Sequence, residues 1–182
     1  MDKYRYKYPL IQYKLYRKNP CIVCIEDGID QIHEYFKSTD HYLTIKNKKG
    51  KYNVKSLRVN SFVMQAWDKM FKYKIINWLA LNQENYKRYK ECENNDKEQK
   101  EILAAILKGN ILSFAKGIDW TVDREIDLKV VDIERVRLQK FKGQGRLAFN
   151  VSFLTNVFLP NYIGLGKGSS VGFGTVKQFI EK

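Results

Sequence analysis

A long β-hairpin pattern in the last third of the chain restricts its fold more than any other feature. Residues 125–141 and 146–159 flank the turn Gly143-Gln144-Gly145. Because successive side chains of a strand point to opposite faces, alternating apolar residues predict a strand with one buried face. The return run places apolar residues in such alternation at Leu147, Phe149, Val151, Phe153, Val157 and Leu159. We therefore expect a long hairpin that covers a core.

The segments around this hairpin predict a ferredoxin-like unit. Residues 71–79 are typical of a strand and residues 82–89 of a short helix. Residues 96–116 are typical of a long amphipathic helix that ends at Gly117, and residues 171–180 of a last strand. The apolar stripe of the long helix consists of Leu103, Ile106, Leu107, Asn110, Ile111 and Phe114. The order strand, helix, strand, strand, loop, strand is that of a ferredoxin-like unit whose second helix is shortened or replaced by a loop.

The first part of the chain has a similar but shorter order. Residues 8–16 and 21–25 are typical of two paired strands, and residues 26–36 of a helix. Residues 41–45 are typical of a further strand. The strand and helix that open a ferredoxin-like unit are missing from this order. The basic, turn-rich run at residues 46–51 is interpreted as a solvated linker, with direct RNA contact as the alternative.

These patterns together predict an α+β chain of two ferredoxin-like (RRM-like) units. The first unit, residues 1–50, is expected to be incomplete at its N-terminus. The second unit, residues 51–182, is expected to end in a glycine-rich loop and a strand. The structural class of the hydrophobic segment at residues 57–70 stays open.

The formal net charge of +13 implies a negatively charged partner, such as nucleic acid, an anionic membrane or an acidic protein. Apolar runs such as residues 75–81 are too short to span a bilayer, and residues 1–7 lack the apolar core of a signal peptide. We therefore expect a cytoplasmic protein that does not bind membranes. Cys21 and Cys24 fall in a predicted strand, where residues three apart point to opposite faces, so we expect no metal site.

The run at residues 164–174 carries the most information about function. Five glycines fall in it, together with Lys167, Ser169 and Ser170. Glycine lets backbone N–H groups approach an anion closely, and lysine and hydroxyl groups add donors for phosphate oxygens. We exclude a P-loop because Gly168 follows Lys167, and a dinucleotide-binding unit because no helix and acidic residue follow. An RNA backbone remains, with a hairpin connection that binds no ligand as the alternative.

We expect this loop to be exposed and to bind RNA together with two basic residues near the N-terminus. The expected RNA-binding residues are Gly164, Gly166, Lys167, Gly168, Ser169, Ser170, Gly172, Gly174, Lys14 and Arg17. In an exposed loop, replacing Lys167 with Ala or Gly166 with Val should weaken RNA binding without unfolding the protein.

The run at residues 164–174 resembles the signature of the CRISPR-associated endoribonucleases that cut repeat RNA, which belong to the RAMP superfamily. Three more segments resemble one branch of that family, namely residues 6–14, residues 77–82 with 85–86, and residues 109–116. The resemblance spans essentially the whole chain. It implies two ferredoxin-like domains side by side and CRISPR repeat RNA as the substrate. It also implies cleavage without a metal or other cofactor, in which the 2′-hydroxyl attacks the adjacent phosphate.

The same resemblance implies a histidine as the general base. In this branch, however, the histidines precede the segment that resembles residues 6–14, and the chain begins just before that segment. We therefore leave the catalytic residues open, with His41, Tyr6 and Tyr8 as candidates and a structural role as the alternative for each. His33 is expected at the edge of the core.

Three functions stay open at this point. The first is a repeat-RNA endoribonuclease whose sequence here begins late. The second is a non-catalytic RNA-binding subunit of a guide-RNA ribonucleoprotein, and the third is a basic scaffold protein. The expected partners are CRISPR repeat RNA, subunits of a CRISPR effector complex, and a second copy of the chain bound through an exposed sheet edge. Any RNA binding should depend steeply on salt.

Overall fold

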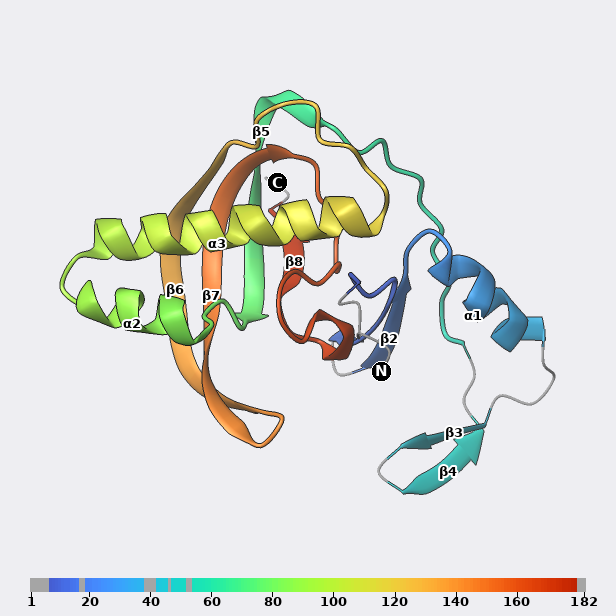
Figure 1. Cartoon of the computed structure of the whole chain (residues 1–182). Coiled ribbons are helices and arrows are strands. Elements are labelled where there is room, and N and C mark those ends of the chain that lie inside the picture. The colour runs from blue at the N-terminus through green and yellow to red at the C-terminus, as the bar shows by residue number, and fades with distance from the viewer. Residues whose placement is uncertain (1–6, 17–18, 38–41, 46, 52–53, 180–182) are drawn as a thin grey trace, which may run out of the picture.

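The computed structural model describes residues 7–16, 19–37, 42–45, 47–51 and 54–179. Over these residues the chain is an α+β protein, as the sequence predicts. A thin N-terminal part consists of short hairpins and one helix, whereas a layered C-terminal part has a sheet with helices on one face (Figure 1). None of the described helices is long and apolar enough to cross a membrane.

A four-stranded antiparallel sheet forms the C-terminal part. Its strands are β5 (Ala66–Trp78), β6 (Leu128–Phe141), β7 (Gln144–Val157) and β8 (Thr175–Gln178), in the order β6-β7-β5-β8. This order places the first and third strands of the unit in the middle, as in a ferredoxin-like fold. The predicted topology is therefore confirmed, and a loop with a short 3-10 turn at Ser169–Val171 stands in place of the second helix.

The helix α3 (Asp96–Gly117) lies across this sheet and packs its apolar stripe against it (Figure 1). The shorter helix α2 (Gln83–Glu91) precedes it and begins at Asn82, whose side chain accepts the N–H of Asn85 (2.7 Å). Side chains that are less than 2% exposed include Trp78, Tyr73, Phe114, Phe149, Phe153, Ile75, Leu103, Leu107 and Ile111. Burial of each such side chain contributes about 1.5–3 kcal/mol, so this core holds the C-terminal part together.

A bulge interrupts β5 close to its end. The pairing of β5 with β7 shifts between Ile75 and Trp78, and Asn77 between them has a φ of 55°. Because of the bulge, Ile75 and Trp78 both face the core although they are three residues apart. The side-chain oxygen of Asn150 accepts the N–H of Asn77 (2.9 Å), and the carbonyl of Asn77 accepts the N–H of Gly174 (3.1 Å). The bulge thus connects β5 to both β7 and the glycine-rich run.

The N-terminal part consists of two separate hairpins and a helix. Strands β1 (Ile11–Tyr16) and β2 (Asn19–Cys24) form one hairpin, and β3 (Tyr42–Ile45) and β4 (Lys48–Lys51) form the other. Helix α1 (Gly28–Lys37) lies between them in sequence, and Figure 1 shows the β3-β4 hairpin well apart from β2. The basic run that was interpreted as a linker therefore contains a strand, which pairs with β3 through its backbone.

Two further expectations for this region need correction. The segment at residues 57–70, whose class stayed open, contains no helix or strand up to residue 65, where Leu57 and Val59 are 67% and 79% exposed, and it belongs to β5 from Ala66 onward. His33 on α1 is exposed to solvent and does not lie at the edge of the core. The reason is that α1 has no broad sheet beneath it, since β1 and β2 form a sheet of only two strands.

Candidate nucleic-acid interface

The glycine-rich run folds back on itself between β7 and β8. The N–H of Leu165 donates to the carbonyl of Gly174 (2.9 Å), which closes the base of the loop. Farther out, the turn Ser169–Val171 lies between Gly168 (φ 73°) and Gly172 (φ 95°). Both values lie in the left-handed region, where side chains with a Cβ are strained. These two glycines are therefore needed for the shape of the turn.

Two other glycines let the loop pack closely against the rest of the protein. A Cβ on Gly166 would lie 2.6 Å from Oδ1 of Asn110 and 2.8 Å from Nε1 of Trp78. A Cβ on Gly164 would lie 2.8 Å from Nζ of Lys14. The loop is thus partly buried, which corrects the expectation of an exposed loop. Replacing Gly166 with Val would disturb the packing of Trp78 as well as any RNA contact.

A closed ring of hydrogen bonds, which we call the Gly164 clamp, ties the N-terminal part to the loop. The Tyr8 hydroxyl donates to the carbonyl of Gly164 (2.9 Å), and the N–H of Gly164 donates to Oε1 of Gln12 (2.7 Å). Nε2 of Gln12 donates to the Tyr8 oxygen (2.8 Å), which completes the ring. Gln12 is fully buried, so each of these polar groups depends on its partner in the ring.

The clamp shows what Tyr8 and Gln12 do in this fold. Burial raises the pKa of the Tyr8 hydroxyl, which therefore stays protonated and serves as the donor to Gly164. The ring of Tyr8 also packs on Phe114 of α3, with 5.0 Å between the ring centroids. Sequence reasoning missed Gln12 altogether. Gln12 lies two residues before Lys14 and so shares a face of β1 with it, which was the one signal in the sequence. The local sequence does not indicate that this face contacts the glycine-rich loop.

Lys14 lies beneath the loop rather than on the surface. It is 7% exposed, and its ammonium group donates to the carbonyl of Ser169 (3.2 Å). Burial lowers the pKa of Lys14 to about 8, while Cys21, its direct partner on β2, acts to raise it. Lys14 was predicted to contact RNA, and the structure brings it to the predicted loop from the inner side.

The remaining residues of the predicted loop differ in access to solvent. Lys167 is exposed, Ser170 and Gly168 are half-buried, and Ser169 is buried. Lys167 and Ser170 are thus the polar side chains of the loop that solvent can reach. Three predicted residues lie outside the described part of the chain, namely Arg17, Tyr6 and His41.

The tip of the β6-β7 hairpin meets the outer side of the loop. The rings of Phe141 and Phe173 pack edge to face, with 5.3 Å between their centroids. Burial, followed by the charges of Arg146 and Lys142, lowers the pKa of Lys167, so both of these cations lie within electrostatic reach of Lys167. We call Lys142, Arg146 and Lys167 the basic corner. Sequence reasoning named only Lys167, because Lys142 lies in the hairpin turn and Arg146 in β7, and their proximity to the loop is not local in sequence.

Arg137 extends the basic corner from Arg146 along the sheet. Arg137 and Arg146 lie on neighbouring strands, and Arg137 donates to Oδ1 of Asn77 (3.1 Å). The Nε atoms of both arginines are buried and have no hydrogen-bond partner in the described structure. Buried guanidinium donors without partners are costly, and a bound anion would stabilise them.

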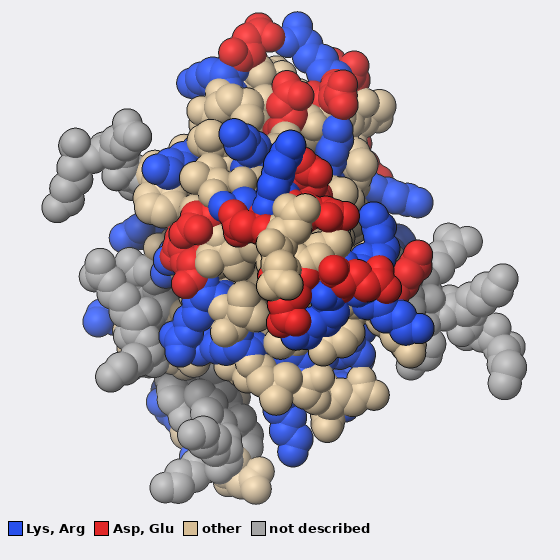
Figure 2. Space-filling model, turned by 90° about the vertical axis from the view of Figure 1, so that its left-hand side faces the viewer, with Lys and Arg blue, Asp and Glu red and all other residues tan. Residues whose placement is uncertain are grey.

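Acidic residues on another face of the molecule offset the basic residues there. Figure 2 views the molecule from the left of Figure 1 and shows acidic and basic side chains interspersed on that face. Ion pairs of this kind lie along α3, where Asp96 pairs with Lys100 (2.7 Å) and Lys97 with Glu101 (4.0 Å). This paired surface is less suited to a polyanion than the basic corner.

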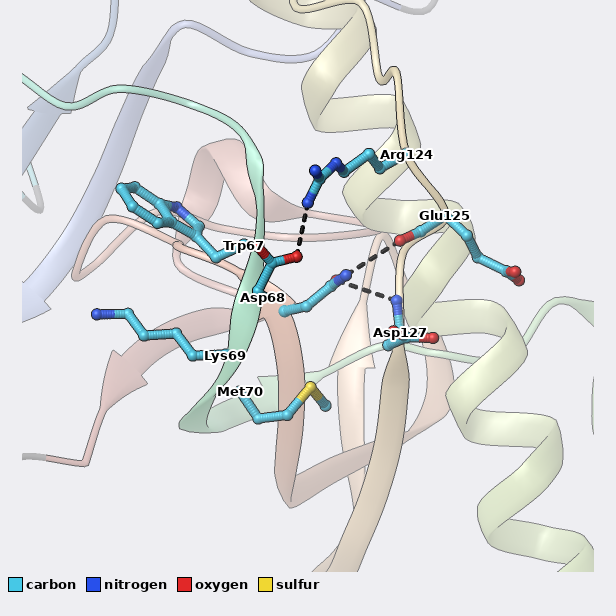
Figure 3. A pocket seen from close by; sticks show the side chains of 8 residues that line it. Trp67, Asp68, Lys69, Met70, Arg124, Glu125 and Asp127 are labelled. Carbon is cyan, nitrogen blue, oxygen red and sulfur yellow. Dashed lines mark hydrogen bonds and ion pairs between the residues drawn. The ribbon is translucent and has the colours of Figure 1, made fainter.

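A hollow of about 360 Å³ lies at the other end of β5 from the loop (Figure 3). Two of its charged residues pair with each other, as Arg124 donates to Asp68 (2.7 Å). The side chain of Asn156 bonds the backbone, donating to the Glu125 carbonyl (3.0 Å) and accepting from the N–H of Asp127 (3.0 Å). Because these groups already have partners, the hollow offers no converging donors for a ligand, and we assign it no chemistry.

Solved structures of known proteins match the chain along most of its length. A structure described as the crystal structure of Cas6b is 31% identical, has a TM-score of 0.85, and is matched over 96% of this chain and 79% of its own. A CRISPR RNA processing endoribonuclease Cas6b is 30% identical, with a TM-score of 0.74 and coverage of 96% and 83%. Csf5, a type IV Cas6 crRNA endonuclease, is 13% identical with a TM-score of 0.63, covers 94% and 68%, and shows the fold alone.

Sequence comparisons agree with these matches. An uncharacterized protein of Methanocaldococcus jannaschii is 43% identical over 115 residues, which is 63% of this chain and 76% of that protein. The family model of the Cas6b N-terminal domain matches residues 1–63, and that of the Cas6b C-terminal domain matches residues 65–179. The resemblance noted from the sequence is thereby confirmed, together with the fold of two ferredoxin-like domains. The chain belongs to the Cas6b family.

Proposed function

We propose that this chain is a CRISPR RNA processing endoribonuclease that binds repeat RNA at the glycine-rich loop and the basic corner. The observation that carries the proposal is the loop itself, whose exposed Lys167 lies beside Lys142 and Arg146. A solved relative of 30% identity, matched over 96% of this chain, bears the description of such an enzyme. The high net positive charge of the chain supports a polyanionic substrate.

In this proposal the RNA backbone runs over the outer side of the loop. Lys167 and the half-buried Ser170 contact phosphate oxygens, and the basic corner neutralises neighbouring phosphates. The unpartnered Nε atoms of Arg137 and Arg146 support a phosphate path that continues along the sheet. Ser169 is buried, so its hydroxyl is assigned no contact with RNA.

The proposed chemistry is transesterification within the repeat. A general base takes the proton of a 2′-hydroxyl, whose oxygen attacks the adjacent phosphorus. The bond to the 5′-oxygen of the next nucleotide breaks, and a general acid protonates that oxygen. The products are a 2′,3′-cyclic phosphate and a 5′-hydroxyl, and no metal takes part. His41 and Tyr6 stay the candidates for these proton transfers, whereas the Tyr8 hydroxyl already serves the Gly164 clamp.

Incubation of the chain with repeat RNA in EDTA tests this proposal. The RNA is transcribed from the CRISPR array of the same genome, with an unrelated hairpin of equal length as the control. We expect one cut per repeat and a cyclic phosphate on the upstream product. Absence of the cut with bound RNA would overturn the nuclease, and equal binding of both RNAs would overturn repeat recognition. The variants His41→Ala and Tyr6→Phe then test the two candidates.

A non-catalytic RNA-binding subunit of a guide-RNA ribonucleoprotein is the second candidate function. The engagement of the Tyr8 hydroxyl with Gly164 favours it, because this tyrosine is then occupied with holding the loop. This function predicts tight, repeat-specific binding without cleavage in the same assay. Co-purification with subunits of an effector complex, or a dimer seen by light scattering in the presence of RNA, would identify its protein partners.

A further inference from the structure

We propose that Lys14 is a positioning residue for RNA binding, whose ammonium group holds the Ser169–Val171 turn from beneath and supplies a positive charge behind the surface that contacts phosphate. The proposal rests on the proposed function of the loop. It goes further, because it makes the affinity for RNA depend on the charge of a residue that the RNA does not touch.

The geometry excludes a direct contact between Lys14 and a phosphate on the outer face of the loop. Lys14 is 7% exposed, and its ammonium group lies against Gly164, where a Cβ would come within 2.8 Å of Nζ. Its recorded hydrogen-bond acceptor among the described residues is the carbonyl of Ser169, at 3.2 Å. Lys14 therefore acts through the backbone of the turn, beside the Gly164 clamp on the same face of β1.

The surroundings of Lys14 make its charge sensitive to a bound anion. Desolvation disfavours the ammonium form and lowers its pKa to about 8, and Cys21 on β2 is the titratable group that faces it. Among residues 164–174 the one charged side chain is Lys167, which belongs to the basic corner. Phosphates bound there would neutralise these cations and favour the charged form of Lys14.

The sign of the pH dependence follows from linkage. Lys14 is charged below pH 8 and loses its charge as the pH rises through about 8. If RNA binds the charged form more tightly, its affinity falls between pH 7 and pH 9.5. The decrease is about tenfold for each pKa unit by which RNA raises the pKa of Lys14. The stability that Lys14 contributes changes in the opposite direction, since an unfolded lysine with the higher pKa binds more protons over this range.

Fluorescence anisotropy with labelled repeat RNA, measured for the full chain at pH 7.0, 8.0, 9.0 and 9.5, tests the inference. The variants are Lys14→Met, which is neutral at every pH, and Lys97→Met, which removes a charge from the exposed side of α3. We expect wild type and Lys97→Met to lose affinity by tenfold or more across pH 8. Lys14→Met should bind about tenfold more weakly at pH 7 and show a flatter profile.

Thermal melts at each pH separate positioning from stability. If Lys14→Met fails to fold, the pH dependence of wild-type RNA affinity still tests the inference. The Lys14→Gln variant, which keeps a polar group but is neutral, then replaces Lys14→Met. The inference is overturned if wild-type affinity is constant from pH 7.0 to 9.5, or if Lys14→Met follows the wild-type profile. Failure of the wild type to bind repeat RNA at pH 7 would instead overturn the proposed function.

Discussion

The two halves of this chain achieve order in different ways. Every fully buried apolar side chain recorded in the described structure lies at or after Ala66, in the sheet and α3. In the N-terminal hairpins and α1, large apolar residues are instead 38–77% exposed, namely Tyr13, Leu15, Ile22, Ile29 and Tyr42. The N-terminal part is held to the rest by buried polar contacts with the loop, through Tyr8, Gln12 and Lys14, and by the packing of Tyr8 and Ile25 against the edge of the core.

The glycine-rich loop therefore has two roles. It joins the N-terminal part to the C-terminal part, and it is the proposed RNA-binding surface. A hydrophobic core tolerates small shifts, because its attraction depends on area and not on direction. The Gly164 clamp, in contrast, requires three groups at hydrogen-bond distance. The shape of the loop is therefore coupled to the docking of β1.

The largest expected effect is a difference in the free energy of unfolding between a core substitution in the C-terminal part and an exposed substitution in the N-terminal part. Phe149 is fully buried in the core, and Leu15 is 77% exposed. Phe149→Ala should reduce the free energy of unfolding by about 3–5 kcal/mol, because it leaves a cavity. Leu15→Ala should change it by less than about 0.5 kcal/mol. Urea unfolding followed by circular dichroism gives both values, and similar losses for the two variants would refute the contrast.

The next effect concerns how tightly the loop packs. Gly166→Val should cost about 1–3 kcal/mol, since its side chain would meet Asn110 and Trp78. Gly109 on α3 provides a matched control, because a Cβ there meets nothing within 4 Å. Gly109→Ala should raise the free energy of unfolding by about 0.5–1 kcal/mol. A stable Gly166→Val protein would mean that the loop is looser than described.

A smaller, local effect is expected for the clamp. Gln12→Leu leaves the N–H of Gly164 without its acceptor, at a cost of about 1–3 kcal/mol. Hydrogen exchange should speed up in β1 and in residues 161–174, while α3 keeps its protection. The control Gln31→Leu changes an exposed residue of α1 and should leave exchange in these segments unaltered. Uniform acceleration over the whole chain would show that the two halves unfold together.

The smallest effect on stability, and a clear one on binding, is expected at the basic corner. Lys142→Ala and Lys167→Ala should each weaken RNA binding several-fold and lower the slope of log affinity against log salt by about 0.7–0.9. Neither should change the free energy of unfolding by more than about 0.5 kcal/mol. Lys97→Ala is the control for lost charge. Salt titrations of RNA affinity measure the slopes, and unchanged slopes would remove these lysines from the interface.

Sequence reasoning succeeded where the determinants were local. The alternation in β7 and the helical spacing of Leu103, Leu107 and Ile111 predicted elements that the structure contains. The strand β4 was missed because a run of lysines with one glycine has no apolar alternation, although its backbone pairs with β3. The alternation of apolar residues indicates which strands have a buried face, so it does not predict a hairpin whose faces are both exposed.

The site was predicted less well than the fold, because its contacts span nearly the whole chain. Gly164 meets Gln12 across 152 positions in sequence, and Ser169 meets Lys14 across 155. The glycine spacing indicated a tight loop, yet it could not show which glycines shape the turn and which make room for neighbours. Likewise, the proximity of Lys142 and Arg146 to Lys167 depends on how the hairpin tip folds over the loop.

The bulge in β5 has a mechanical consequence. On the central strand β5, Asn77 accepts hydrogen bonds from Arg137 of β6 and from Gly174 at the end of the loop, and its N–H donates to Asn150 of β7. A force on the loop or on the β6-β7 hairpin is therefore transmitted to the central strand of the sheet, so neither element moves independently. An RNA bound to both the loop and the β6-β7 hairpin would therefore contact two elements whose separation is fixed by the sheet.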